Sequence, residues 1–224
     1  MTLLQRVPLF PLNTVLFPRM TLPLRIFEER YKLMIGRCVE QELPFGVVLI
    51  RSGVEVGGPA QPHEVGTLAR IVHAHRNADG GFQIQTIGLQ RFRIVALQDD
   101  EAYLTADIEM LQYDRPAPGP EEDALRDLAQ SVAVLYAEQL RLTLALSGMW
   151  QASLEAPDEP EKLADLVAAR ITAPEIVKQR MLEAPTLMDR LELELATLTE
   201  IIPILTERVR QAQLVRWGSL SAVN

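Results

Sequence analysis

Two histidines have a spacing that would allow both to bind one metal ion. His73 and His75 lie two residues apart in a run typical of a β-strand, so both imidazoles would lie on one face. A solvated strand face explains the same spacing, and we favour it. The only other histidine is His63 and the only cysteine is Cys38, whereas zinc requires three or four converging ligands.

Three neighbouring acids form the second candidate site. Asp99, Asp100 and Glu101 follow one another between two predicted strands. Crowded carboxylates can exchange protons with a substrate or bind calcium. A polar hairpin turn has the same composition and is the interpretation we favour.

The sequence motifs of nucleophilic catalysis and of phosphate binding are absent. No G-x-S-x-G is present, and no lysine follows a glycine, so the sequence contains neither a nucleophile elbow nor a phosphate-binding loop. Cys38 lies at helical core spacing and is predicted to be a buried structural thiol. We therefore expect no enzyme activity and no cofactor.

Charge limits the possible partners. The net charge is −8, and residues 113–224 carry 18 acidic against 11 basic side chains. A phosphate backbone would be repelled by this half, so a nucleic acid is a poor candidate partner. The apolar amino terminus is interrupted by prolines and no long apolar run follows, so we expect no membrane segment. A single cysteine favours a cytoplasmic location.

The first half must position these residues on strands. Runs rich in β-branched and aromatic residues occupy 21–26, 44–51, 66–75, 82–97 and 103–111. Asn77-Ala-Asp-Gly-Gly81 predicts a hairpin turn. Between the early strands, residues 28–42 have helical apolar spacing. We expect a small β-barrel or rolled sheet that is plugged by one helix.

Beyond residues 113–123, which hold three prolines and a glycine, the apolar period changes to that of helices. Leu125, Val132 and Leu142 lie on the stripe of a first helix. Three later helix starts are predicted by the pairs Asp158/Glu161, Thr172/Glu175 and Thr186/Asp189, each spaced as a capping box. Pro203 interrupts the stripe of the last helix.

The segment VPLFPLNTVLFPRMTLPLRIFEERY, residues 7–31, resembles the opening motif of the amino-terminal substrate-binding domain family of Lon proteases. Similar family signatures are FGVVLI at 45–50, VGTLARI at 65–71 and GFQIQTIGLQRFRI at 81–94. The segment 175–195 resembles the family's Lys-Gln pair and the start of its long last helix.

This resemblance implies an α+β fold, with a PUA-like six-stranded pseudo-β-barrel in residues 1–112, a linker at 113–123 and a helical bundle in 124–224. It implies a stand-alone, non-catalytic module without the ATPase and protease domains, binding unfolded or tagged proteins or one specific partner. One alternative is a small-ligand-binding or metal-dependent hydrolytic domain acting through His73 and His75 or the acids at 99–101. Another is an adaptor for a separate ATPase-protease subunit.

Most of the opening motif is expected to be structural. Arg25, Glu28 and Arg30 could form charge-assisted hydrogen bonds that tie the strand to the helix, while Phe27 and Tyr31 pack beneath them.

Large apolar residues in predicted loops are candidates for protein contact. Phe17, Met20, Met149 and Trp150 meet this criterion.

Overall fold

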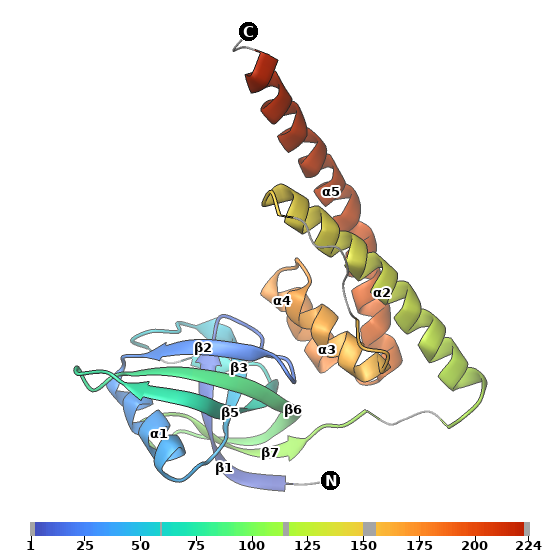
Figure 1. Ribbon diagram of the computed structural model, residues 1–224. Helices are drawn as coiled ribbons and strands as arrows, with labels where there is room; N and C mark the ends of the chain where they lie inside the picture. Colours follow the sequence, from blue (N-terminus) through green and yellow to red (C-terminus); the bar gives the residue numbers. More distant parts are fainter. Residues whose placement is uncertain (1–2, 59, 114–116, 150–155, 222–224) are drawn as a thin grey trace. The chain divides into compact units, whose positions relative to one another are not determined.

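The computed structural model describes residues 3–58, 60–113, 117–149 and 156–221 (Figure 1). The chain divides into two compact units. The β unit consists of Met1–Tyr113 and Pro174–Glu183, and the helical unit consists of Asp114–Ala173 and Ala184–Asn224. The first division falls between Tyr113 and Asp114. Residues 174–183, expected in the helical bundle, group instead with the sheet.

The β unit is built on one largely antiparallel sheet, in which the described residues form seven strands rather than the expected six. The strands are β1 (Leu3–Leu12), β2 (Thr21–Ile26), β3 (Phe45–Gly53), β4 (Ala60–Pro62), β5 (Val65–Arg76), β6 (Phe82–Gln98) and β7 (Thr105–Met110). Their order is β1-β7-β6-β5-β3-β4, and β2 pairs with the first half of β6. A parallel pairing of β1 with β3 closes the sheet on itself.

Strand β1 is absent from the sequence prediction because it contains Pro8 and Pro11. Its first part, up to Pro8, pairs with β7, and its last part, from Leu9 to Leu12, pairs with β3. Within the part that pairs with β7, the register shifts between Leu4 and Val7, and Arg6 in this interval has a positive φ of 54°. Because each half pairs with a different neighbour, the strand accommodates residues that lack a backbone donor.

Helix α1 (Glu29–Glu40) packs its apolar face onto the sheet (Figure 1). Of the five apolar residues on the predicted helical stripe, Tyr31, Met34, Ile35 and Cys38 are buried, whereas Val39 is 38% exposed. The Tyr31 ring lies 4.2 Å from that of Phe10 in β1. Burial raises the pKa of the Cys38 thiol to about 11, so this side chain acts as a small core hydrophobe.

Helix α4 (Glu175–Glu183) joins the β unit through polar contacts. Gln179 Nε2 donates to the Val65 carbonyl at 2.9 Å, and Arg91 Nη1 donates to the Leu182 carbonyl at 2.7 Å. Glu175 Oε2 accepts from the Val15 amide at 2.7 Å. The carboxylate expected to form a capping box with Thr172 therefore binds the turn after β1 instead.

The helical unit contains α2 (Pro120–Leu146), α3 (Pro160–Arg170) and α5 (Leu187–Ser221), and both α2 and α3 contact α5. The Thr186/Asp189 capping box is confirmed, because the Asp189 carboxylate accepts from the Thr186 amide at 3.1 Å and the Thr186 hydroxyl accepts from the Asp189 amide at 3.1 Å. Asp158 does not cap α3, which begins at Pro160 after Glu159. In the described part of the chain, no helix is long and apolar enough to cross a bilayer.

Candidate protein-binding site

The opening motif forms an ion pair between Glu28 and Arg30 at the start of α1, and we name this pair the anchor. Arg30 Nη2 lies 3.1 Å from Glu28 Oε2, and the guanidinium lies over the Tyr31 ring, 4.5 Å from its centroid. Both charged side chains are largely covered, with 27% and 17% of their surface exposed. This pair therefore holds a fixed geometry, unlike an ordinary surface ion pair.

The anchor holds the loop between β3 and β4. Arg30 donates to the carbonyl oxygens of Gly58 at 3.1 Å and Glu55 at 3.4 Å. Glu28 Oε2 accepts from the Gly57 amide at 3.2 Å. Arg25, expected to take part, lies exposed on β2. The charge-assisted bonds therefore tie a loop to the helix, not the preceding strand to the helix.

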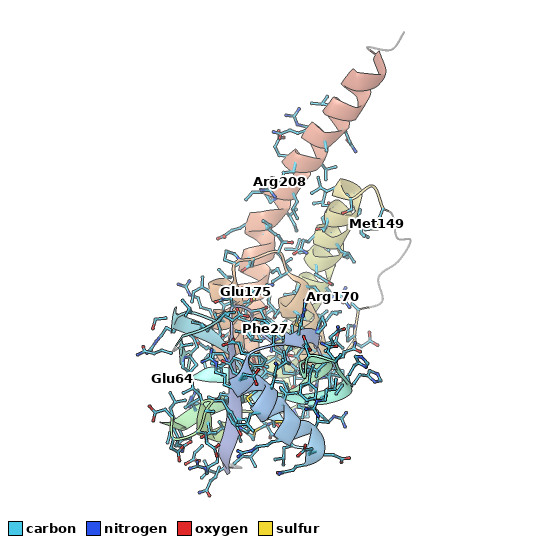
Figure 2. All side chains as sticks on the ribbon, turned by 90° about the vertical axis from the view of Figure 1, so that its left-hand side faces the viewer. Phe27, Glu64, Met149, Arg170, Glu175 and Arg208 are labelled. Atoms are coloured by element: carbon cyan, nitrogen blue, oxygen red, sulfur yellow. The ribbon has the colours of Figure 1, made fainter. Side chains whose placement is uncertain are left out.

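Three large apolar side chains project from the two anchored segments. Phe27 is 54% exposed, Val54 53% and Val56 54%. We name these three residues the apolar tip; Phe27 is labelled in Figure 2. Phe27 was expected beneath the motif, but Ile26, which is 2% exposed, fills the core position and turns its neighbour outward. Exposed apolar groups on segments held in place are typical of surfaces that bind proteins.

The contact residues proposed from the sequence differ in exposure where the structure describes them. Phe17 is fully buried, because the turn that carries it folds onto β6, where the Arg19 amide donates to the Gly88 carbonyl at 2.8 Å. Met20 is partly buried against the core. Met149 is 59% exposed after α2, and Trp150 lies outside the described residues.

The sequence reasoning missed Val54 and Val56. The available signal was a pair of valines alternating with polar residues in a glycine-rich loop, where no strand continues to bury them.

The histidine pair lies on β5, where both side chains are exposed in an open groove of about 670 Å³. In the described ranges, no three His, Cys, Asp or Glu side chains are grouped so that they could hold a metal ion.

Two of the three acids in the cluster at 99–101 are paired with arginines. Asp100 Oδ2 lies 2.8 Å from Arg6 Nη2, and Glu101 Oε2 lies 3.0 Å from Arg37 Nη1. The hydrogen bond from Arg6 lowers the pKa of Asp100. A carboxylate held ionised beside a guanidinium is poorly suited to act as a general acid near neutral pH.

The sequence and fold match one described family. The family of the ATP-dependent protease La (LON) substrate-binding domain matches residues 6–200. The chain belongs to this Lon substrate-binding domain family. Helix α4 lies within the matched range, as do the anchor and the apolar tip.

Related sequences belong to much longer proteins. The chain is 32% identical over 194 residues to the Lon protease of Anaeromyxobacter dehalogenans and 31% identical over 196 residues to Lon protease 2 of Myxococcus xanthus. These matches cover 86% and 87% of this chain but 23% of each relative. The chain thus spans about a quarter of the length of the curated relatives that it matches.

Solved structures support the fold. A Lon N-terminal domain protein from Xanthomonas campestris is 27% identical, with a TM-score of 0.62 over 88% of this chain and 98% of that chain. The N-terminal domain of the Mycobacterium avium complex Lon protease has a TM-score of 0.64 at 18% identity, covering 87% and 98%. The second likeness concerns the fold alone.

Proposed function

We propose that this Lon-type domain is a non-catalytic module that binds exposed apolar segments of unfolded client proteins through the apolar tip. The observation that carries this proposal is the combination of three half-exposed apolar side chains with the partly buried ion pair of Arg30 and Glu28. The family description, substrate binding, agrees with it.

The physical argument concerns the cost of binding. Ordering a flexible loop on binding consumes part of the interaction energy. Here the loop is already held by Arg30 and Glu28. The backbone amide of Asn13 also donates a hydrogen bond to Glu55 Oε2 in this loop, at 3.0 Å. The loop that carries Val54 and Val56 therefore loses little conformational entropy when an extended apolar segment binds to it.

The test is fluorescence anisotropy of a labelled, permanently unfolded protein titrated with this chain, with the natively folded form of the same protein as the comparison. Phe27→Ser, Val54→Ser and Val56→Ser are combined in one variant. We expect saturable binding to the unfolded form and a loss of affinity of about tenfold or more in the variant, since each tenfold change corresponds to about 1.4 kcal/mol.

A matched control removes three exposed apolar side chains elsewhere. Val95, Leu97 and Val134 are 59%, 47% and 58% exposed, and their combined replacement by serine should leave the affinity within about twofold of the unmodified chain. Equal losses in both variants would contradict the assignment to the apolar tip. No binding to the unfolded form would contradict the proposed function itself.

A further inference from the structure

A second surface of the β unit is chemically unlike the apolar tip. Strands β2, β6 and β5 lie side by side, and their outward side chains form two cross-strand rows. One row is Arg25, Gln83 and His75, and the next is Pro23, Gln85 and His73. These six residues, which we name the strand face, line the groove of about 670 Å³.

The strand face contains no acid, although the chain carries 30 acidic residues and a net charge of −8. The next cross-strand row, in which Ile87 of β6 pairs with Thr21 and Arg70, adds the side chain of Arg70. Among the described residues, no carboxylate forms an ion pair with Arg25 or Arg70. The nearest acids along the chain have other partners, because Glu28 pairs with Arg30 and Asp79 Oδ1 accepts from the Gly81 amide at 3.0 Å.

We propose that the strand face binds an acidic, extended segment of a protein. Guanidinium, amide and imidazole groups all donate hydrogen bonds, and carboxylates accept them without donating. The two rows are two residues apart along each strand, about 6.6–6.8 Å, which is also the repeat of side chains on one side of an extended peptide. Acids at alternate positions of such a segment therefore meet successive rows.

Charge favours a polypeptide over a nucleic acid. A nucleic acid carries closely spaced phosphates along its whole length and would extend beyond the strand face over an acidic protein. A short acidic segment contacts only the local surface, where Arg25 carries a positive charge and no acid belongs to the strand face.

This inference rests on the proposed function, because a client protein would supply the acidic segment together with the apolar one. The two surfaces differ in chemistry, so two probes separate them. The first is a labelled 12-residue peptide of alternating Glu and Ser, with a Gln-Ser peptide as its neutral match. The second is the permanently unfolded apolar protein used above.

The decisive variant combines Arg25→Gln, His73→Gln and His75→Gln in the full-length chain. All three side chains are exposed, so folding should be preserved, which a denaturation curve verifies. We expect the Glu-Ser peptide to bind the unmodified chain in a salt-sensitive way, and the variant to lose about tenfold or more in affinity. The Gln-Ser peptide should bind neither protein.

A control removes more charge away from this surface. Arg51 and Arg93 are exposed and lie outside the strand face, so replacing both by Gln should change the affinity for the Glu-Ser peptide less than about twofold. An equal loss in the control and the strand-face variant would overturn the proposal. So would tighter binding of a single-stranded DNA of the same length than of the peptide.

The two proposals fail separately. If the unfolded apolar protein binds but the Glu-Ser peptide does not, the strand-face proposal is wrong and the proposed function stands. If the peptide binds and depends on Arg25, while the unfolded apolar protein does not bind, the strand-face site stands and its clients are not apolar unfolded chains.

Discussion

At the scale of single residues, Gly88 shows how a side chain can be excluded by a distant turn. Its amide donates to the Met20 carbonyl at 2.9 Å, and its carbonyl accepts from the Arg19 amide at 2.8 Å. A Cβ atom at Gly88 would clash with the carbonyl oxygen of Phe17 and lie 3.2 Å from Thr67 Cγ2. The obstacle is mainly backbone, which cannot move aside by changing a rotamer.

We therefore predict that Gly88→Ala destabilises the β unit by about 1–3 kcal/mol, the usual cost of overpacking. Chemical denaturation followed through the strand signal in circular dichroism measures this change. Gly36→Ala is the matched control, because Gly36 lies within α1 and its added methyl group meets nothing within 4 Å. The control should raise stability by about 0.5–1 kcal/mol. Equal effects of the two substitutions would contradict the explanation.

At the scale of elements, α5 is joined to α3 by buried charges. Arg190 Nη1 lies 2.9 Å from Asp165 Oδ1 in α3, and Arg190 Nε lies 3.2 Å from Glu194 Oε1 one turn along α5. All three side chains are buried. One guanidinium thus faces two carboxylates, and burial raises the pKa of Glu194 to about 8.

This raised pKa predicts how the stability of the helical unit depends on pH. The folded unit keeps a proton on Glu194 at pH values where the unfolded chain has released it. The resulting stabilisation is complete below the carboxyl's ordinary pKa and is lost as the pH rises towards about 8. The denaturation midpoint measured from the helical signal should therefore decrease as the pH is raised from about 5 to about 8.

Two glutamate substitutions on α5 test this origin. Glu194→Gln should remove most of the fall, because the amide has no proton to release in this range. Glu192→Gln, at an exposed position two residues earlier, should leave the fall unchanged. A pH dependence that survives Glu194→Gln would assign it to other groups.

At the scale of the whole molecule, the chain leaves the β unit, builds part of the helical unit, returns to contribute α4 and then leaves again. Arg91 is buried at 4% exposure, stacks on Tyr113 with its guanidinium 3.7 Å from the ring centroid, and donates to the Leu182 carbonyl. The β unit thus depends on residues that lie about seventy positions beyond its last strand.

We predict that a fragment ending at Tyr113 is less stable than the β unit of the full chain. In this fragment Arg91 loses the Leu182 carbonyl, and the Val65 carbonyl loses the side-chain amide of Gln179. Each buried polar group left without its partner costs about 1–3 kcal/mol of stability. Hydrogen exchange of β5 measured by mass spectrometry should be faster in the fragment. Attaching residues 174–183 through a flexible linker should restore protection, and a fragment as protected as the full chain would contradict the prediction.

The sequence by itself determined the local features of this protein. The apolar period fixed α1 and the long helices, Thr186 and Asp189 marked the start of α5, and the motif at 7–31 indicated the family, which the match to residues 6–200 shows. Such features depend on neighbouring residues, so they can be read from the chain.

Only the tertiary structure decided which apolar and charged groups are covered. Periodicity distinguishes the two faces of a strand or helix, but the partner that covers a face comes from distant sequence. Phe17 is buried while Phe27 is exposed, Glu175 binds the turn after β1 instead of capping its own helix, and α4 joins the sheet. The strand face arises in the same way, because the pairing of β2, β6 and β5 brings its members together. For the apolar tip, bonds from Arg30 and Glu28 hold the loop that carries the two valines.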